Sequence, residues 1–186
     1  MKKILMIVAS FRKNSFNRQL AEAVGELFRG KAEVKILEYG DVPLFNQDME
    51  FPTPEAVGRV REEVLSSDGI WIFSPEYNSK TPGVLKNLLD WLSRPVTETA
   101  GSRESAVRGK CVTVSSVAGK SAGAGVRKDL SELLSKMSMN VVYGEGCGIA
   151  LGSDAFSTGK MDLSEEEINM FRAQAEELLR AAGQMI

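Results

Sequence analysis

The chain has 186 residues, with 23 Lys and Arg against 25 Asp and Glu, which gives a formal net charge of −2. Hydrophobic residues make up 43% and charged residues 26%, which is typical of a folded globular protein. This balance excludes non-specific nucleic-acid binding, which needs a strong basic excess. The apolar start, residues 1–8, is too short for a signal peptide or a membrane span. We therefore expect a cytoplasmic protein with no nucleic-acid and no membrane partner.

The sequence contains no histidine and only two cysteines, Cys111 and Cys147. The lack of histidine excludes Ser-His-Asp and Cys-His nucleophile systems, zinc sites with histidine ligands and a histidine general base. The cysteines form no C-x-x-C pair, and we interpret them as small buried hydrophobes. We expect no catalytic side chain and no metal site, so an enzyme of this sequence would take its chemistry from a cofactor.

The hydrophobic pattern of the first half predicts strands and helices in alternation. Short apolar or β-branched runs are typical of strands and predict them at 3–8, 34–37 and 69–74. Apolar residues at helical spacing predict helices at 15–28, 57–65 and 82–92. We expect Thr81 to cap the last of these helices, with Pro82 at its first position.

The second half continues the alternation with strands at 112–117 and 141–143 around a helix at 126–137. A last helix begins at Ser164, which forms a capping box with Glu167. Two connections remain. Residues 94–109 are interpreted as a polar surface excursion. Residues 146–163 are rich in Gly and Ser, and a surface loop is favoured there over a lid.

Five strands alternating with five helices predict an α/β fold, a three-layer sandwich with a parallel sheet covered on both faces. We find no repeat, linker or low-complexity tract and expect a single domain over 1–186. In a flavodoxin-like sheet of order 2-1-3-4-5, ligands bind between strands 1 and 3, beyond their carboxyl ends. The loops that follow Val8 and Ser74 are therefore the ones to examine.

The loop at residues 9–18 joins a buried strand to a helix N-terminus and holds two hydroxyls, two asparagines and three cations. A helix N-terminus offers free N–H groups and the positive end of the helix dipole, which suits a phosphate. The loop lacks the glycine pattern of a P-loop or a dinucleotide fold, so a phosphate monoester fits better. The alternative is that Ser15 only caps the helix and the cations are solvated.

The loop at residues 74–83 places two prolines around a polar stretch with one aromatic residue. Such a loop is stiff and can present backbone groups to a planar ring. The alternative is a turn that merely precedes the next helix.

Together these loops resemble the NADPH-dependent FMN reductase family, which has a flavodoxin-like fold and includes azo-, quinone and chromate reductases. The S-x-R-x-x-S-x-N pattern of residues 10–17 and the P-E-Y-N of residues 75–78 carry the resemblance, which extends from residue 1 to about residue 140. Residues 43–46, Pro-Leu-Phe-Asn, are similar to the family's loop after strand 2. By this resemblance, the first loop holds the FMN phosphate and the second lines the isoalloxazine ring.

The resemblance also implies a third contribution, from the loop after the fourth strand at residues 115–120. The glycines at 119–125 are spaced differently from the family pattern, so a flexible turn and a flavin contact both stay open there. The cofactor-binding residues predicted in this way are Ser10, Arg12, Ser15, Phe16, Asn17, Pro75, Glu76, Tyr77, Asn78, Ser115 and Gly119.

The resemblance implies an FMN-dependent oxidoreductase with NADPH or NADH as co-substrate. A hydride would pass from the nicotinamide through FMN to a small electron-poor acceptor such as a quinone, an azo dye, a metal oxyanion or free flavin. One alternative is an electron carrier of the flavodoxin type, against which the small net charge and 7% aromatic content argue. Another is a flavin-binding interaction module without turnover.

The helix at 82–92 carries two apolar stripes, one with Val84, Leu88 and Trp91 and one with Leu85, Leu89 and Leu92. One stripe is enough to cover the sheet, so the second predicts an interface in a homodimer or homotetramer. Family members commonly pair with FMN near the interface, which points the same way. The alternative is that residues 39–53 or 94–109 fold over the second stripe.

Overall fold

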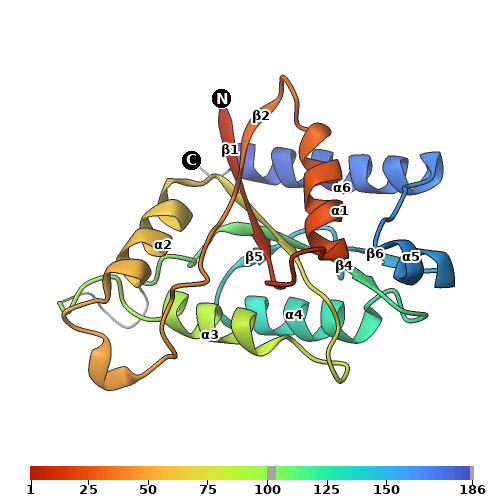
Figure 1. Ribbon diagram of the computed structural model, residues 1–186. Helices are drawn as coiled ribbons and strands as arrows, with labels where there is room; N and C mark the ends of the chain where they lie inside the picture. The colour runs from red at the N-terminus through yellow and green to blue at the C-terminus, as the bar shows by residue number, and fades with distance from the viewer. Residues whose placement is uncertain (100–103, 185–186) are drawn as a thin grey trace.

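A parallel sheet lies at the centre of the molecule, with helices on both faces (Figure 1). The computed structural model describes residues 1–99 and 104–184. The strand order β2-β1-β3-β4-β5 is the predicted one, with a further strand, β6, paired to β4. The strands are β1 (Lys2–Val8), β2 (Ala32–Ile36), β3 (Gly69–Phe73), β4 (Cys111–Ala118), β5 (Asn140–Val141) and β6 (Cys147–Ala150).

The helices divide between the two faces of the sheet, as the predicted sandwich requires. Helices α1 and α6 cover one face, and α2, α3 and α4 cover the other (Figure 1). Their bounds are α1 (Phe16–Glu26), α2 (Glu55–Ser66), α3 (Gly83–Leu92), α4 (Ala124–Lys136), α5 (Ser153–Thr158) and α6 (Glu165–Gly183), with a 3-10 turn at Gln47–Met49. None of these helices in the described part of the chain is long and apolar enough to cross a membrane.

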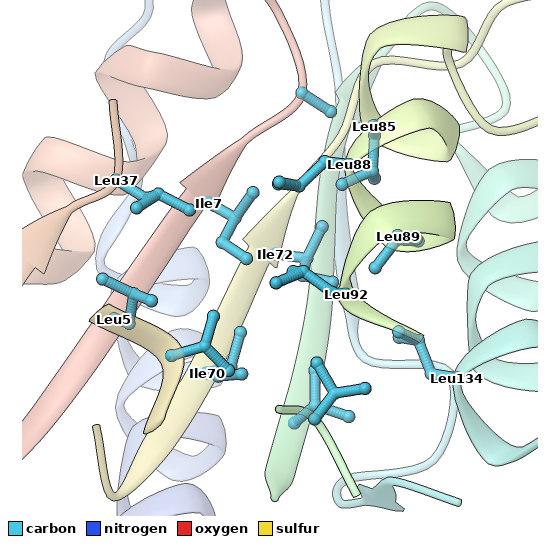
Figure 2. Close-up of a cluster of buried hydrophobic side chains, with 14 of the residues drawn as sticks. Leu5, Ile7, Leu37, Ile70, Ile72, Leu85, Leu88, Leu89, Leu92 and Leu134 are labelled. Carbon is cyan, nitrogen blue, oxygen red and sulfur yellow. The ribbon is translucent and has the colours of Figure 1, made fainter. Parts of the chain in front are cut away.

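Alternate residues of the central strands enter two separate hydrophobic clusters, one on each face. In β1, Leu5 and Ile7 join the cluster on the α3 side, whereas Ile4, Met6 and Val8 face α1 and α6. Figure 2 shows the first cluster, in which strand residues meet leucines of α3. The unalternating apolar runs of the sequence are explained by this burial on both faces.

The edge beside β4 is made of two short strands where the sequence predicted one. Strand β5 pairs with Cys111 and Val112, and β6 pairs with residues 115–118. Between them the chain passes so close to β4 that a Cβ atom on Gly146 would lie 1.7 Å from the carbonyl oxygen of Val114. The segment predicted as a loop at 146–163 therefore contains a strand, β6, and a short helix, α5.

Of the two helix caps predicted outright, Ser164 is confirmed and Thr81 is not, and the cap offered as an alternative for Ser15 is also present. Ser15 caps α1 by accepting a hydrogen bond from the Arg18 amide, and Ser164 forms the capping box of α6. Thr81 does not cap α3: the residue at that position is Pro82, and the Thr81 hydroxyl donates to Asp129 of α4 over 2.7 Å.

Both apolar stripes of α3 are buried within this one chain, apart from Val84, which is 38% exposed. The segment at 39–53 covers Trp91: the indole N–H donates to the Pro43 carbonyl over 2.8 Å, and the Phe45 ring lies 5.0 Å away. The second stripe therefore does not indicate an interface, because the segment at 39–53 folds over it, as the alternative to an interface predicted. Of the connection at 94–109, residues 100–103 lie outside the described residues, and Ala106 and Val107 are buried.

Candidate cofactor-binding site

A cavity of about 310 Å³ opens at the carboxyl edge of the sheet, where β1, β3 and β4 end. It lies where strand order reverses between β1 and β3, the place predicted for a ligand. Most of the residues that line it belong to the loops predicted from sequence; the full set is Ser10, Arg12, Ser15, Phe16, Asn17, Pro75, Glu76, Tyr77, Val117, Ala118, Gly119, Leu151 and Phe156.

The first wall of the cavity is the loop that leads into α1. Ser15 caps the helix, so the free N–H groups of the first turn point toward this end of the cavity. The Arg12 guanidinium lies 4.9 Å from the centre of the Phe16 ring and has no hydrogen bond or ion pair with the described residues. A positive helix end, two hydroxyls and an unneutralised arginine make this wall suitable for an anion.

Asn17 joins this wall to the end of β4. Its amide nitrogen donates to the Val117 carbonyl over 3.0 Å, and its amide oxygen accepts from the Val117 N–H over 2.9 Å. The second N–H of the amide is left for a ligand. Through its bonds to Val117, the residue predicted as a phosphate contact also fixes the loop before α1 to the end of β4.

The second wall is the loop after β3, which α4 holds at both ends. The Glu76 carboxylate accepts from the Val126 N–H and from the Ser121 hydroxyl, both over 2.9 Å. These hydrogen bonds lower the pKa of Glu76 below its usual value, with the backbone N–H of Val126 as the main cause. At the other end, Asp129 of α4 accepts from the amide and the hydroxyl of Thr81.

Between these anchors the loop forms a tight turn that carries Tyr77 outward. Tyr77 and Lys80 pair across the turn, and Asn78 and Ser79 both have positive φ, at 52° and 60°. Tyr77 is 55% exposed at the rim of the cavity. Asn78, predicted as a ring contact, is exposed and does not line the cavity.

The third wall comes from the end of β4, but not from Ser115. The Ser115 hydroxyl is fully buried on the α6 side, where it accepts from the Trp71 indole and donates to Gln174. Its side chain is on the same face of β4 as that of Val117 but two residues farther from the carboxyl end of the strand, and it does not line the cavity, so a flavin contact by Ser115 stays a prediction. Gly119 does line the cavity, together with Val117 and Ala118.

The glycines of the following turn are explained by packing. Gly123 has a φ of +69°, and a Cβ atom there would lie 1.9 Å from the Ser116 hydroxyl. A Cβ atom on Gly125 would lie 2.8 Å from the Glu76 carboxylate. Close approach to neighbouring residues therefore accounts for these two positions without a ligand contact.

The fourth wall, Leu151 and Phe156, was not predicted. The Leu151 N–H donates to the Ala118 carbonyl over 2.9 Å, which continues the pairing of β6 with β4. Phe156, in α5, meets the Phe16 ring edge-on with ring centres 5.9 Å apart. The only signal in the sequence was an aromatic residue within a stretch otherwise rich in Gly, Ser and Thr.

The strand order and the helices on both faces define a flavodoxin-like fold, and comparison with known proteins gives the family. The family of NADPH-dependent FMN reductases matches residues 2–151. The chain belongs to this family.

Curated relatives include the 2-hydroxy-1,4-benzoquinone reductase of a Burkholderia species, 39% identical over 111 residues, which are 59% of this chain and 61% of that protein. The quinone reductase of Pseudomonas putida is 44% identical over 100 residues, which are 53% of this chain and 54% of that protein. The matched segment thus spans little more than half the length of these relatives.

A solved structure, the flavoenzyme NAD(P)H:(acceptor) oxidoreductase FerB of Paracoccus denitrificans, superposes with a TM-score of 0.85. The superposition covers 99% of this chain and 98% of that one at 24% sequence identity. A similarity of this kind supports the fold that was predicted from the sequence.

Proposed function

We propose that this chain binds FMN and uses a reduced nicotinamide, NADPH or NADH, to reduce a small electron-poor acceptor. The observation that carries the proposal is that the two loops of the family motif line a single cavity beside the N-terminus of α1. The relatives named as quinone reductases favour a quinone as acceptor.

The donors at the α1 end fit a phosphate monoester. Ser10, Arg12 and Ser15 line the cavity next to the first turn of the helix, and Arg12 is free of any carboxylate partner among the described residues. A dianionic phosphate would satisfy the guanidinium, the hydroxyls and the helix N–H groups together.

The rest of the cavity fits a flat ring. Pro75 and Tyr77 lie on one side, and Val117 and Ala118 of the β4 end lie on another. Since α4 holds the 75–81 loop through Glu76 and Asp129, its backbone groups keep their positions when a ring is absent. Such a preformed site costs little ordering on binding.

When bound, FMN supplies the redox chemistry, accepting two electrons from the nicotinamide and giving them to the acceptor. The chain's residues need only hold the cofactor, keep one ring face accessible and exclude water from the other. Among the described residues that line the cavity, only Arg12 and Glu76 carry a formal charge, and the Glu76 carboxylate is already bound by Ser121 and Val126. We assign no proton-transfer role to a side chain.

A turnover assay separates the proposal from its alternatives. The purified protein, reconstituted with FMN, is mixed with NADPH or NADH and a benzoquinone, and nicotinamide absorbance is followed. We expect oxidation that depends on enzyme and quinone. A bound flavin that is not reduced by either nicotinamide would instead favour an electron carrier or a binding module.

We further propose a single domain over 1–186, a cytoplasmic location and a homodimer or homotetramer. The location is supported by the need for reduced nicotinamide and by two buried, unpaired cysteines. Exposed apolar side chains support an oligomer: Tyr77 at the rim of the cavity, and Leu44 and Val84 elsewhere on the surface. Light scattering at micromolar concentration tests it: a mass near 20 kDa for the flavin-loaded protein would contradict an oligomer.

A further inference from the structure

We propose that α5 determines which flavin this chain accepts, with Phe156 closing the phosphate end of the cavity to anything larger than a terminal phosphate. This inference rests on the proposed function. It assigns a specificity role to α5, which lies beyond residue 151, where the match to the family ends.

Phe156 lies against the loop at residues 9–18, where that loop enters α1. Its ring meets that of Phe16, the first residue of α1 after the cap Ser15, with ring centres 5.9 Å apart and planes at 85°. The Arg12 guanidinium lies over the same Phe16 ring. Phe156 and Arg12 thus both contact Phe16 and both line the cavity at the end that would receive the phosphate.

The segment that carries Phe156 is held by hydrogen bonds at both ends. On one side β6 pairs with residues 115–118 of β4, and Leu151 donates to Ala118. On the other side the Gln19 side chain in α1 donates to the Gly159 carbonyl over 2.9 Å and accepts from the Met161 N–H over 3.1 Å. Figure 1 shows α5 next to β6, on the side of the molecule where α1 begins. A wall held in this way does not move aside at low cost.

Phe156 contributes little to the hydrophobic core. Its side chain is 62% exposed although it is large and apolar. An exposed aromatic ring at the mouth of a cavity adds little to stability, so we explain Phe156 by its effect on which ligands enter the cavity. FMN ends in its phosphate, whereas FAD continues from the same phosphate into a second phosphate and an adenosine. The adenosine would have to extend past Arg12 and Phe156, which both line the cavity and both contact Phe16.

The test compares flavin affinities of four proteins: wild type, Phe156→Ala, Phe156→Tyr and Leu65→Ala. Leu65 is an apolar residue of α2, 51% exposed and outside the cavity, so its removal is a control for loss of apolar surface. Apo-proteins are titrated with FMN and with FAD, and flavin fluorescence gives both dissociation constants. Circular dichroism melts verify that each variant is folded.

We expect wild type, Phe156→Tyr and Leu65→Ala to prefer FMN, and Phe156→Ala to lower the ratio of the FAD to the FMN dissociation constant by about tenfold or more. An unchanged ratio in Phe156→Ala, or wild type that binds FAD as tightly as FMN, would overturn the inference and leave the proposed function standing. Failure of wild type to bind either flavin would instead contradict the proposed function, and the inference with it.

Discussion

Arg12 places a guanidinium at the N-terminal end of α1 with no neutralising carboxylate among the described residues. We expect Arg12→Ala to weaken FMN binding by about 1.5–3 kcal/mol, roughly 10- to 150-fold in Kd, because a charge-assisted hydrogen bond to phosphate is lost. Riboflavin, which has no phosphate, should bind both proteins equally. Fluorescence titration measures both, and Arg29→Ala, an exposed arginine just after α1, is the control. An equal loss for riboflavin would contradict a phosphate contact.

Glu76 gives the site a defined dependence on pH. Because hydrogen bonds from Val126 and Ser121 lower the pKa of Glu76 in the folded state, its stabilising contribution is present above the pKa of the unfolded chain and is lost as the pH falls through the lowered folded pKa. We therefore expect Glu76→Gln to lower Tm at pH 7 and the difference from wild type to shrink in acid. Thermal melts between pH 7 and pH 3 measure this.

The control for that series is Glu22→Gln, at an exposed position of α1. A difference between wild type and Glu76→Gln that stays the same from pH 7 to pH 3 would mean that the carboxylate does not hold the loop.

Neither cysteine is placed to take part in the reaction. Burial raises the pKa of Cys147 to about 11, so it remains a thiol at neutral pH, and Cys111 is fully buried in the core. We expect the double variant Cys111→Ala, Cys147→Ala to oxidise NADPH at a rate within about twofold of wild type, also in the presence of EDTA, because the cofactor carries the chemistry. Loss of turnover with FMN still bound would reveal a redox thiol.

The turn between β5 and β6 contains two glycines whose substitution should have different effects on stability. Gly144 and Gly146 both have positive φ, but only at Gly146 would a Cβ atom meet a backbone atom, the Val114 oxygen at 1.7 Å. We expect Gly144→Ala to cost about 1–2 kcal/mol of unfolding free energy, the strain of a left-handed alanine. Gly146→Ala should cost about 3 kcal/mol or more, because β4 and the edge must separate. Urea unfolding compares the pair; equal losses would contradict this packing.

Element order and sheet topology could be predicted from the sequence because each buried strand is a short apolar run and the longer helices carry apolar residues at helical spacing. Strand β6 and helix α5 could not, because a four-residue strand and a six-residue helix leave no period long enough to detect. No local pattern indicates that the Ser115 hydroxyl already bonds to Trp71 and Gln174, because these contacts join residues 44 and 59 positions apart in the chain.

The site was predictable to the extent that it depends on local motifs. The residues of 10–17 and 75–77 lie together in the cavity because parallel strands deliver both loops to one edge. Phe156 and Leu151 reach the same cavity through long-range pairing of β6 with β4, which no local pattern reveals.

Because Trp91 is buried within one chain, a substitution there tests the stability of the fold and not an interface between chains. Trp91 is fully buried under the 39–53 segment, so Trp91→Glu should destabilise the folded chain by about 3–5 kcal/mol through an unpaired buried charge and lost packing. Val84→Glu, on the exposed part of the same helix, should change stability by less than about 0.5 kcal/mol. Urea unfolding measures both. A Trp91→Glu protein as stable as wild type would contradict the burial of this helix within one chain.

The proposal that this cavity binds FMN, with the phosphate at the N-terminus of α1 and the ring at the loop after β3, is tested most directly by comparing the affinities of the apo-protein for FMN and for riboflavin. The apo-protein is titrated with each flavin under the same conditions and ring fluorescence is followed. We predict that FMN binds at least about tenfold more tightly than riboflavin, since only FMN brings a phosphate to Arg12 and the first turn of α1. Equal affinity for the two flavins, or no binding of either, would contradict the assignment of this cavity.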